Sequence, residues 1–188
     1  MGRKRRGNFH KKTSPLVSSH ARHTPDGYQG IVLGRGLVCF NVPKSWVIAA
    51  YTPFTMHDQP QPNDTSRLSA SYWQSPLGID WRLLPVSALL ADTIQHIPLP
   101  VLTQSEVIPM AREDIEAVWV ETRFLDPQAL RPAYTRNLMA RGRGIHALIS
   151  LDFWVEDAPK LSAMWEEIQR SLRFGREIVD PTEGEMPQ

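Results

Sequence analysis

The carboxyl-terminal half of the chain alternates apolar and polar residues with a period of two. The alternation runs through residues 116–125, 131–140 and 145–154, and this period is typical of strands that bury one face. The segment Arg141-Gly142-Arg143-Gly144 separates the last two stretches, and its glycines accept the positive φ that a tight hairpin needs. We therefore expect three neighbouring antiparallel strands.

Two other stretches carry apolar residues at helical spacing. One predicted helix covers residues 86–97 and is stopped by Pro98. The other begins at Asp157, which we expect to cap the helix, and it accepts Pro159 in its first turn. Its apolar face consists of Leu161, Met164, Trp165, Ile168 and Leu172, and Gly175 is its expected stop.

The amino-terminal half gives shorter signals. Apolar residues predict strands at 37–40 and 46–51, a turn between them at 41–45, a loop at 52–66, a strand at 68–73, and a loop with one short strand at 98–112. Strands followed by a helix, three long strands and a second helix indicate an α+β protein. Its antiparallel sheet would be packed by helices.

Composition supports one folded domain of residues 31–176 between two tails, 1–30 and 177–188. Hydrophobic residues make up 41% of the 188 and charged residues 22%, a balance that excludes wholesale disorder. The single cysteine, Cys39, excludes an intramolecular disulfide and is interpreted as an inert buried thiol. Apolar runs are far shorter than the roughly 18 residues a membrane helix needs. We expect no membrane insertion and a cytoplasmic location.

Charge is concentrated at the amino terminus. Residues 1–23 hold seven basic side chains and no acidic one, which leaves the remainder with fourteen basic and twenty acidic side chains. One interpretation is an arm for nucleic acid, in which basic side chains release phosphate counterions. The other is a solvated tail or a misassigned start. The residues of the candidate arm are Arg3, Lys4, Arg5, Arg6, Lys11 and Lys12.

Motifs with a defined chemistry are missing from the sequence. It contains no nucleophile elbow, phosphate-binding loop or zinc-protease motif, so we expect no cofactor and no metal. His20 and His23 have a spacing that metal sites use, but they lack further ligands nearby. Gly34-Arg35-Gly36 precedes a strand and is interpreted as loop geometry. Arg141–Gly144 resembles an RNA-contacting segment, yet the hairpin turn already explains its glycines.

One group of side chains on the predicted strands is a candidate site. Alternation places Trp119, Glu121 and Arg123 on one side of their strand. Neighbouring strands could add to the same face Tyr134, Arg136, His146, Asp152 and Trp154. Such a face could be cross-strand pairing only, a binding surface of rigid aromatics and charges, or an acid–base site built on Glu121, His146 and Asp152.

The segment Phe40-Asn41-Val42-Pro43-Lys44-Ser45-Trp46 resembles the F-x-V-P-x-x-W opening of the PsbP-like superfamily. Residues 131–173 and the ending Ser171-Leu172-Arg173-Phe174 resemble the strand pair and closing helix of that family. The resemblance spans about residues 37–174. It implies an α/β/α sandwich whose members are mostly non-enzymatic assembly factors, adaptors and chaperones of secretion effectors. It carries over no binding residue, and the basic amino terminus departs from the family pattern.

These observations lead to one main expectation and two rivals. The main expectation is a non-catalytic adaptor or chaperone that binds another protein through Trp119, Arg123, Tyr134 and Arg136, with homodimer formation left open. The first rival is a nucleic-acid or ribosome-associated protein that binds through residues 1–23. The second is a hydrolase-like enzyme that uses His146 and Asp152.

Overall fold

The computed structural model describes residues 24–75, 78, 83–96 and 100–175. Within these residues lie two α-helices, α1 (Val86–Gln95) and α2 (Ala158–Ser171). The strands are β1 (Tyr28–Leu33), β2 (Val38–Pro43), β3 (Val47–Tyr51), β4 (Phe54–His57), β5 (Ser66–Gln74), β6 (Val101–Gln104), β7 (Ile108–Pro109), β8 (Glu116–Leu125), β9 (Pro132–Gly142), β10 (Ile145–Trp154) and β11 (Arg173–Phe174).

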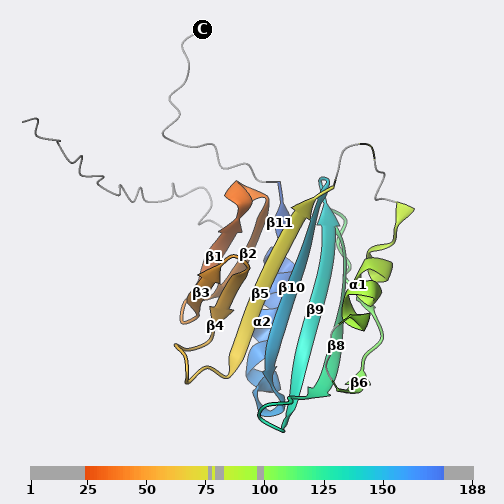
Figure 1. The fold of residues 1–188 in the computed structure, drawn as a ribbon. Coiled ribbons are helices and arrows are strands. Elements are labelled where there is room, and N and C mark those ends of the chain that lie inside the picture. The colour runs from red at the N-terminus through yellow and green to blue at the C-terminus, as the bar shows by residue number, and fades with distance from the viewer. Residues whose placement is uncertain (1–23, 76–77, 79–82, 97–99, 176–188) are drawn as a thin grey trace, which may run out of the picture.

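The strands form a large and a small antiparallel sheet (Figure 1). The large sheet has the order β3-β4-β5-β10-β9-β8-β6, and β7 pairs with β8 next to β6. The small sheet has the order β1-β2-β11. The three strands predicted from alternation, β8, β9 and β10, are central or near-central members of the large sheet and pair with one another.

The turn between β9 and β10 fixes the register of the sheet. Gly142 pairs with Ile145, so only Arg143 and Gly144 lie in the turn. Both have positive φ, 52° and 73°, as a two-residue turn of this hand requires. The predicted hairpin is therefore confirmed, and its register places Leu138 opposite Ile149 in the main core.

One face of the large sheet is covered by α2 and the small sheet. The apolar face of α2 packs on residues such as Leu68, Ile149 and Leu151, all fully buried. From the small sheet, Phe40 reaches the large sheet and meets Phe54 edge-to-face at 6.5 Å between ring centroids. This side contains the larger core, because it brings together side chains from the small sheet, the large sheet and α2.

The other face of the large sheet carries α1, and α2 lies on the far side (Figure 1). Val86 and Leu90 of α1 are fully buried against Val120 of β8 and Met139 of β9. Helices on both faces of an antiparallel sheet make the α/β/α sandwich expected from the sequence, so the α+β fold class is confirmed. Both predicted helices are present, with α1 ending two residues earlier than expected.

Several local expectations are wrong, for identifiable reasons. The predicted turn at 41–45 begins later, since Asn41 and Val42 are buried in β2. The loop at 52–66 contains β4, and the segment 98–112 holds two short strands, β6 and β7, where one was expected. The boundary expected after residue 30 falls inside β1, and β11 was missed.

The start of α2 also differs from expectation. Asp157 makes no side-chain capping hydrogen bond; its carboxylate instead pairs with Lys160 at 2.9 Å, while Pro159 takes the first turn as expected. Glu167, nearly buried in the middle of α2, joins the helix to the small sheet. It accepts a hydrogen bond from Asn41 Nδ2 at 2.7 Å and pairs with Arg170 at 2.6 Å.

We predict that Glu167→Ala destabilises the protein, because it leaves the buried amide of Asn41 without this acceptor. The expected loss is about 1–3 kcal/mol of unfolding free energy, or roughly 2–4 °C of melting temperature per kcal/mol for a chain of this size. The adjacent exposed Glu166 provides a matched control, since Glu166→Ala should change the melting temperature little. Equal melting temperatures for the two variants would contradict the role assigned to Glu167.

Candidate functional site

Five of the side chains singled out from the sequence lie together on the α2 face of β8 and β9. Glu121 is paired with Arg136, and Arg123 with Tyr134, across the two strands. Trp119 lies two residues before Glu121 on the same face. The sequence therefore correctly grouped Trp119, Arg123, Tyr134 and Arg136.

Arg136 is held by its neighbours inside the fold. Its Nε donates to Glu121 Oε2 at 2.7 Å, and its guanidinium lies 5.1 Å from the ring centroid of Phe153 and 5.9 Å from that of Trp119. The residue is only 9% exposed. These contacts agree with the first alternative for this face, cross-strand pairing. Arg136 therefore orders the sheet face and offers little surface to a partner.

Arg123 and Tyr134 lie further along the same face. Tyr134 packs at a tilt on Phe153, with 5.7 Å between ring centroids. Arg123 is half-buried, and its Nε is a buried donor with no hydrogen-bond partner among the described residues. These two residues continue the polar and aromatic strip that begins at Trp119.

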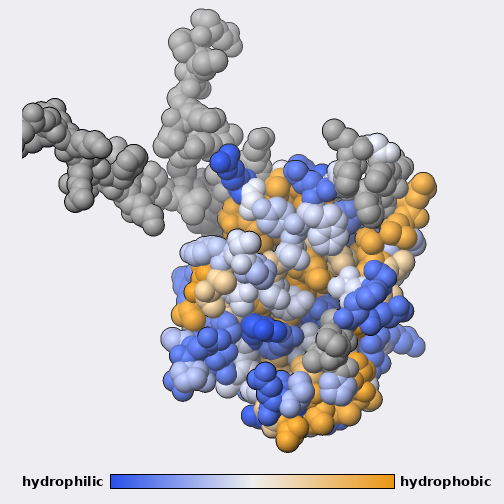
Figure 2. Space-filling view, in the orientation of Figure 1, coloured by the Kyte–Doolittle hydropathy of each residue, from blue (hydrophilic) through white to orange (hydrophobic). Residues whose placement is uncertain are grey.

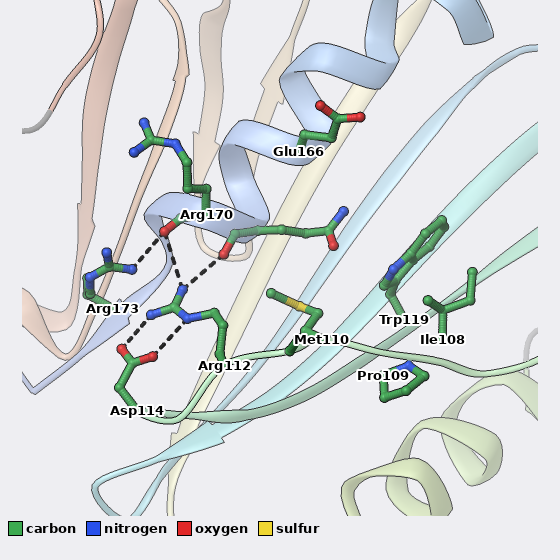
Figure 3. A pocket seen from close by; sticks show the side chains of 11 residues that line it. Ile108, Pro109, Met110, Arg112, Asp114, Trp119, Glu166, Arg170 and Arg173 are labelled. Atoms are coloured by element: carbon green, nitrogen blue, oxygen red, sulfur yellow. Dashed lines mark hydrogen bonds and ion pairs between the residues drawn. The ribbon is translucent and has the colours of Figure 1, made fainter.

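Trp119 borders a cleft between α2 and the β7–β8 edge of the large sheet. The cleft has a volume of roughly 600 Å³, and Trp119 meets Trp165 of α2 edge-to-face at 5.7 Å. Figure 3 shows Trp119 and Ile108 at one end of the cleft, Arg112 and Asp114 at the other, and Met110 between them. The cleft thus has an apolar end and a charged end.

The charged end is built around the last turn of α2. Arg112 Nη1 donates to the carbonyl oxygens of Gln169 at 3.0 Å and of Leu172 at 2.8 Å. The last carbonyl oxygens of a helix have no backbone N–H partner within the helix. Arg112 therefore provides a hydrogen-bond donor to acceptors at the end of α2. The same guanidinium binds the carboxylate of Asp114 and holds the pKa of Asp114 below its ordinary value, chiefly through that hydrogen bond.

Two more arginines stand at this end. Arg170 reaches back to Glu167, and Arg173 Nη1 donates to the carbonyl oxygens of Arg170 and Leu172, each at 2.8 Å. The rim also carries the carboxylates of Asp114 and Glu166. The sequence did not indicate this cleft, because segment 98–112 was expected to be mostly loop.

His146, Asp152 and Trp154 lie on the opposite face of the sheet, which corrects the single face expected from the sequence. They pair with Arg141, Thr135 and Ala133 of β9, and these residues lie on the face opposite to that of Tyr134 and Arg136.

Each of the three has a structural role on that face. His146 is fully buried and stacks on Trp73, with 5.2 Å between ring centroids. Asp152 forms an ion pair with Arg67 at 2.7 Å. The guanidinium of Arg131 lies 4.1 Å from the ring centroid of Trp154.

The hydrolase-like pair of His146 and Asp152 is not assembled. Six residues separate them along β10, a distance of about 20 Å in a strand. Glu121, the third residue of the weighed acid–base set, points to the other face. Among the described residues there is also no group of three side chains able to hold a metal ion.

The remaining sequence candidates have simple structural accounts or lie elsewhere. Gly34–Gly36 forms a short 3₁₀ turn with positive φ at each of its three residues, which agrees with loop geometry. Cys39 is only partly buried in β2, not fully buried as expected. His20, His23 and the basic residues of 1–23 lie outside the described residues. Among those described, no helix has the length and apolarity needed to cross a membrane.

Solved structures with similar folds define the class. The cyanobacterial PsbP of Synechocystis sp. PCC 6803 aligns with a TM-score of 0.53 at 12% identity, over 82% of this chain and 96% of its own. LpqN of Mycobacterium tuberculosis, described as involved in cell envelope biogenesis, aligns with a TM-score of 0.54 at 14% identity, over 86% of this chain and 98% of its own. The protein has a PsbP-like fold, as the sequence resemblance implied.

At the level of sequence, residues 29–178 match the Alr1449 family model. A relative in Nostoc sp. (strain PCC 7120), named "Uncharacterized protein alr1449", is 32% identical over 188 residues, which is 98% of this chain and 97% of the relative. The chain therefore belongs to the Alr1449 family.

We predict that Arg112→Ala lowers the melting temperature and loosens the charged end of the cleft. The change removes the Nη1 donor to the carbonyl oxygen of Gln169 and leaves Arg173 as a donor to that of Leu172, with an expected cost of about 1–3 kcal/mol. Thermal unfolding of Arg112→Ala should be compared with that of Arg35→Ala, which removes an exposed arginine from a turn. A melting temperature as high as that of Arg35→Ala would contradict this role.

His146 is expected to make stability depend on pH. Burial, aided by the charge of Arg141, lowers the pKa of His146, although Glu116 opposes the shift. The pKa of a histidine in an unfolded chain is about 6.5. Below that pH the unfolded state therefore binds more protons than the folded state. The stability contributed by neutral His146 is therefore present above this pH and lost as the pH falls.

Urea unfolding midpoints at about pH 7.5 and about pH 5.5 test this expectation, because they bracket the ordinary titration of histidine. His146→Gln should show a smaller drop in midpoint between the two pH values than the unchanged protein. The control His96→Gln removes a histidine whose side chain is 76% exposed and should keep the full drop. The same drop in all three proteins would rule out His146 as its source.

Proposed function

We propose that this protein is a non-catalytic binding module, adaptor-like or chaperone-like, that holds a segment of another protein in the cleft between α2 and the β7–β8 edge. The observation that carries the proposal is the cleft itself. It offers a rigid aromatic side chain, Trp119, beside apolar side chains and next to a charged end. Aromatic residues in concave sites surrounded by polar groups are common anchors of protein partners.

The edge of the large sheet beside the cleft supports binding of a protein. Ile108 of β7 is 38% exposed, and Val101 and Leu102 of β6 are each 51% exposed. Figure 2 shows apolar side chains gathered at the end of the molecule where β6 lies. An exposed apolar edge next to a cleft provides a larger contact surface than the cleft alone, which favours a macromolecular partner.

The electrostatics of the cleft support a non-catalytic role. Asp114, the lining carboxylate with a shifted pKa, is shifted downward and is ionised at neutral pH. General acid–base groups work best with a pKa near the working pH. Arg112 and Arg170 are engaged by carboxylates of the fold itself, so they are suited to shaping the cleft.

The experiment is quantitative affinity purification from the native cell with two matched variants. Ile108→Asp places a charge at the apolar end of the cleft, where burying it against a partner costs at least about 1.4 kcal/mol, a tenfold loss of affinity. Partner recovery should fall by that factor. Tyr51→Asp changes a residue that is 78% exposed on β3, the opposite edge of the sheet, and should leave recovery unchanged. Melting temperatures of both variants check the fold.

Equal recovery with Ile108→Asp and the unchanged protein would overturn the proposal. The variants also separate it from the rival nucleic-acid role. Binding that survives Ile108→Asp, weakens steeply with salt and disappears when residues 1–23 are deleted would belong to the basic arm. Trp119 and Arg136 are unsuitable test positions, because both are packed into the fold.

A further inference from the structure

The part of the chain that the structure describes ends near the charged end of the cleft. Arg173 lines the cleft, and two residues later Gly175 is fixed by a hydrogen bond from its N–H to the carbonyl of Leu37 at 3.0 Å. The guanidinium of Arg143 stands beside the same residue, with Nη1 at 3.5 Å from the carbonyl oxygen of Gly175. The described chain therefore ends at Gly175, beside Arg143 and two residues after Arg173.

The sequence of residues 176–188 is complementary to the two ends of the cleft. It contains one basic residue, Arg176, and four acidic ones, Glu177, Asp180, Glu183 and Glu185. Between the first two acids lie Ile178 and Val179. The segment thus combines an apolar pair with negative charge, as the cleft combines an apolar end with arginines.

The segment is also long enough to enter the cleft. An extended chain spans up to about 3.3 Å per residue, and Arg173, only three residues before the segment begins, already lines the cleft. Attachment to the same chain gives such a segment an effective concentration on the order of millimolar. Weak contacts are therefore sufficient for occupancy, even though Asp114 and Glu166 on the rim repel part of the negative charge.

We propose that residues 176–188 of this chain occupy the cleft when no partner is bound, with Glu177 near the arginines and Ile178 and Val179 toward Trp119. In this arrangement the segment shields the apolar end of the cleft, and a partner has to displace it. The displacement rests on the proposed function, whereas the occupancy does not.

Paramagnetic relaxation in the full-length chain tests the occupancy. A nitroxide is attached at Thr182→Cys in a Cys39→Ser background, so that it occupies a single position. The reporters are the indole N–H signals of Trp119, at the cleft, and Trp73, on the opposite face of the sheet, assigned with Trp119→Phe and Trp73→Phe. We expect the Trp119 signal to be broadened several-fold more than that of Trp73. Equal broadening would overturn the proposal.

A variant with neutral side chains tests the role of charge. Glu177→Gln, Asp180→Asn, Glu183→Gln and Glu185→Gln together should reduce the extra broadening of Trp119 at least about threefold, as should roughly 1 M salt, which screens exposed charges. Unchanged broadening in the neutral variant would overturn the proposed charge complementarity. The control is a mixture of isotope-labelled protein without nitroxide and unlabelled protein that carries the nitroxide. In this mixture the Trp119 signal is broadened only if the segment of a second copy enters the cleft. Such broadening would overturn occupancy within one chain.

The results are distinguishable from those of the binding experiment. If Trp119 is not broadened but Ile108→Asp still loses its partner, the cleft binds proteins and its resting occupant is not residues 176–188. If Trp119 is broadened and partner recovery survives Ile108→Asp, the segment occupies the cleft and the proposed function is wrong.

Discussion

The pairing register of β8, β9 and β10 determines where every candidate side chain in this protein can act. Side chains alternate between the two faces of a strand, so a slip of one residue would exchange the faces of a whole strand. The two-residue turn at Arg143 and Gly144 excludes that slip, because it aligns Gly142 with Ile145. A part-buried polar pair adds to the specificity, since Ser150 Oγ donates to Asn137 Oδ1 at 2.7 Å between directly opposed residues.

A second constraint acts at the end of α2. The helix contributes the buried face that closes the main core, and its last carbonyls require donors. Arg112 supplies them from the segment between β7 and β8. The same bonds hold that segment against the helix, so the width of the cleft at its charged end follows from helix termination and needs no ligand.

The sequence predicted the parts of the fold that alternation and helical periodicity encode. The long strands and both helices are right, because each buries a continuous apolar face. The hairpin turn is right because its glycines accept positive φ. Some short strands were not predicted. β4 lies among prolines and polar residues. β11 has only two residues, and its pairing with β2 depends on contacts between distant parts of the chain. The resemblance carried by Phe40 to Trp46 added the fold family, which no periodicity could supply.

The expectation that His146, Asp152 and Trp154 share a face with Tyr134 and Arg136 is wrong for a specific reason. With a two-residue turn, paired residues on β9 and β10 always have numbers of opposite parity, so Arg136 shares its face with Leu151 and not with Asp152. The correct hairpin prediction therefore already implied that His146 and Asp152 face away from Tyr134 and Arg136. The cleft could not be inferred in this way, since Ile108 lies in a two-residue strand and Arg112 in the segment after it, and neither has a periodic pattern.

The balance of charge and apolar surface in the cleft also constrains what can bind there tightly. Arg112 and Arg170 are largely compensated by acids of the fold, Asp114 and Glu167, so their charges are already engaged. Affinity for the proposed protein partner would therefore come mainly from apolar burial around Trp119 and along the exposed edge of β6 and β7. A segment of the same chain needs far less, because its attachment supplies the concentration. In the proposed arrangement, one cleft would hold a weakly bound segment of its own chain and release it to a partner that covers both the cleft and the edge.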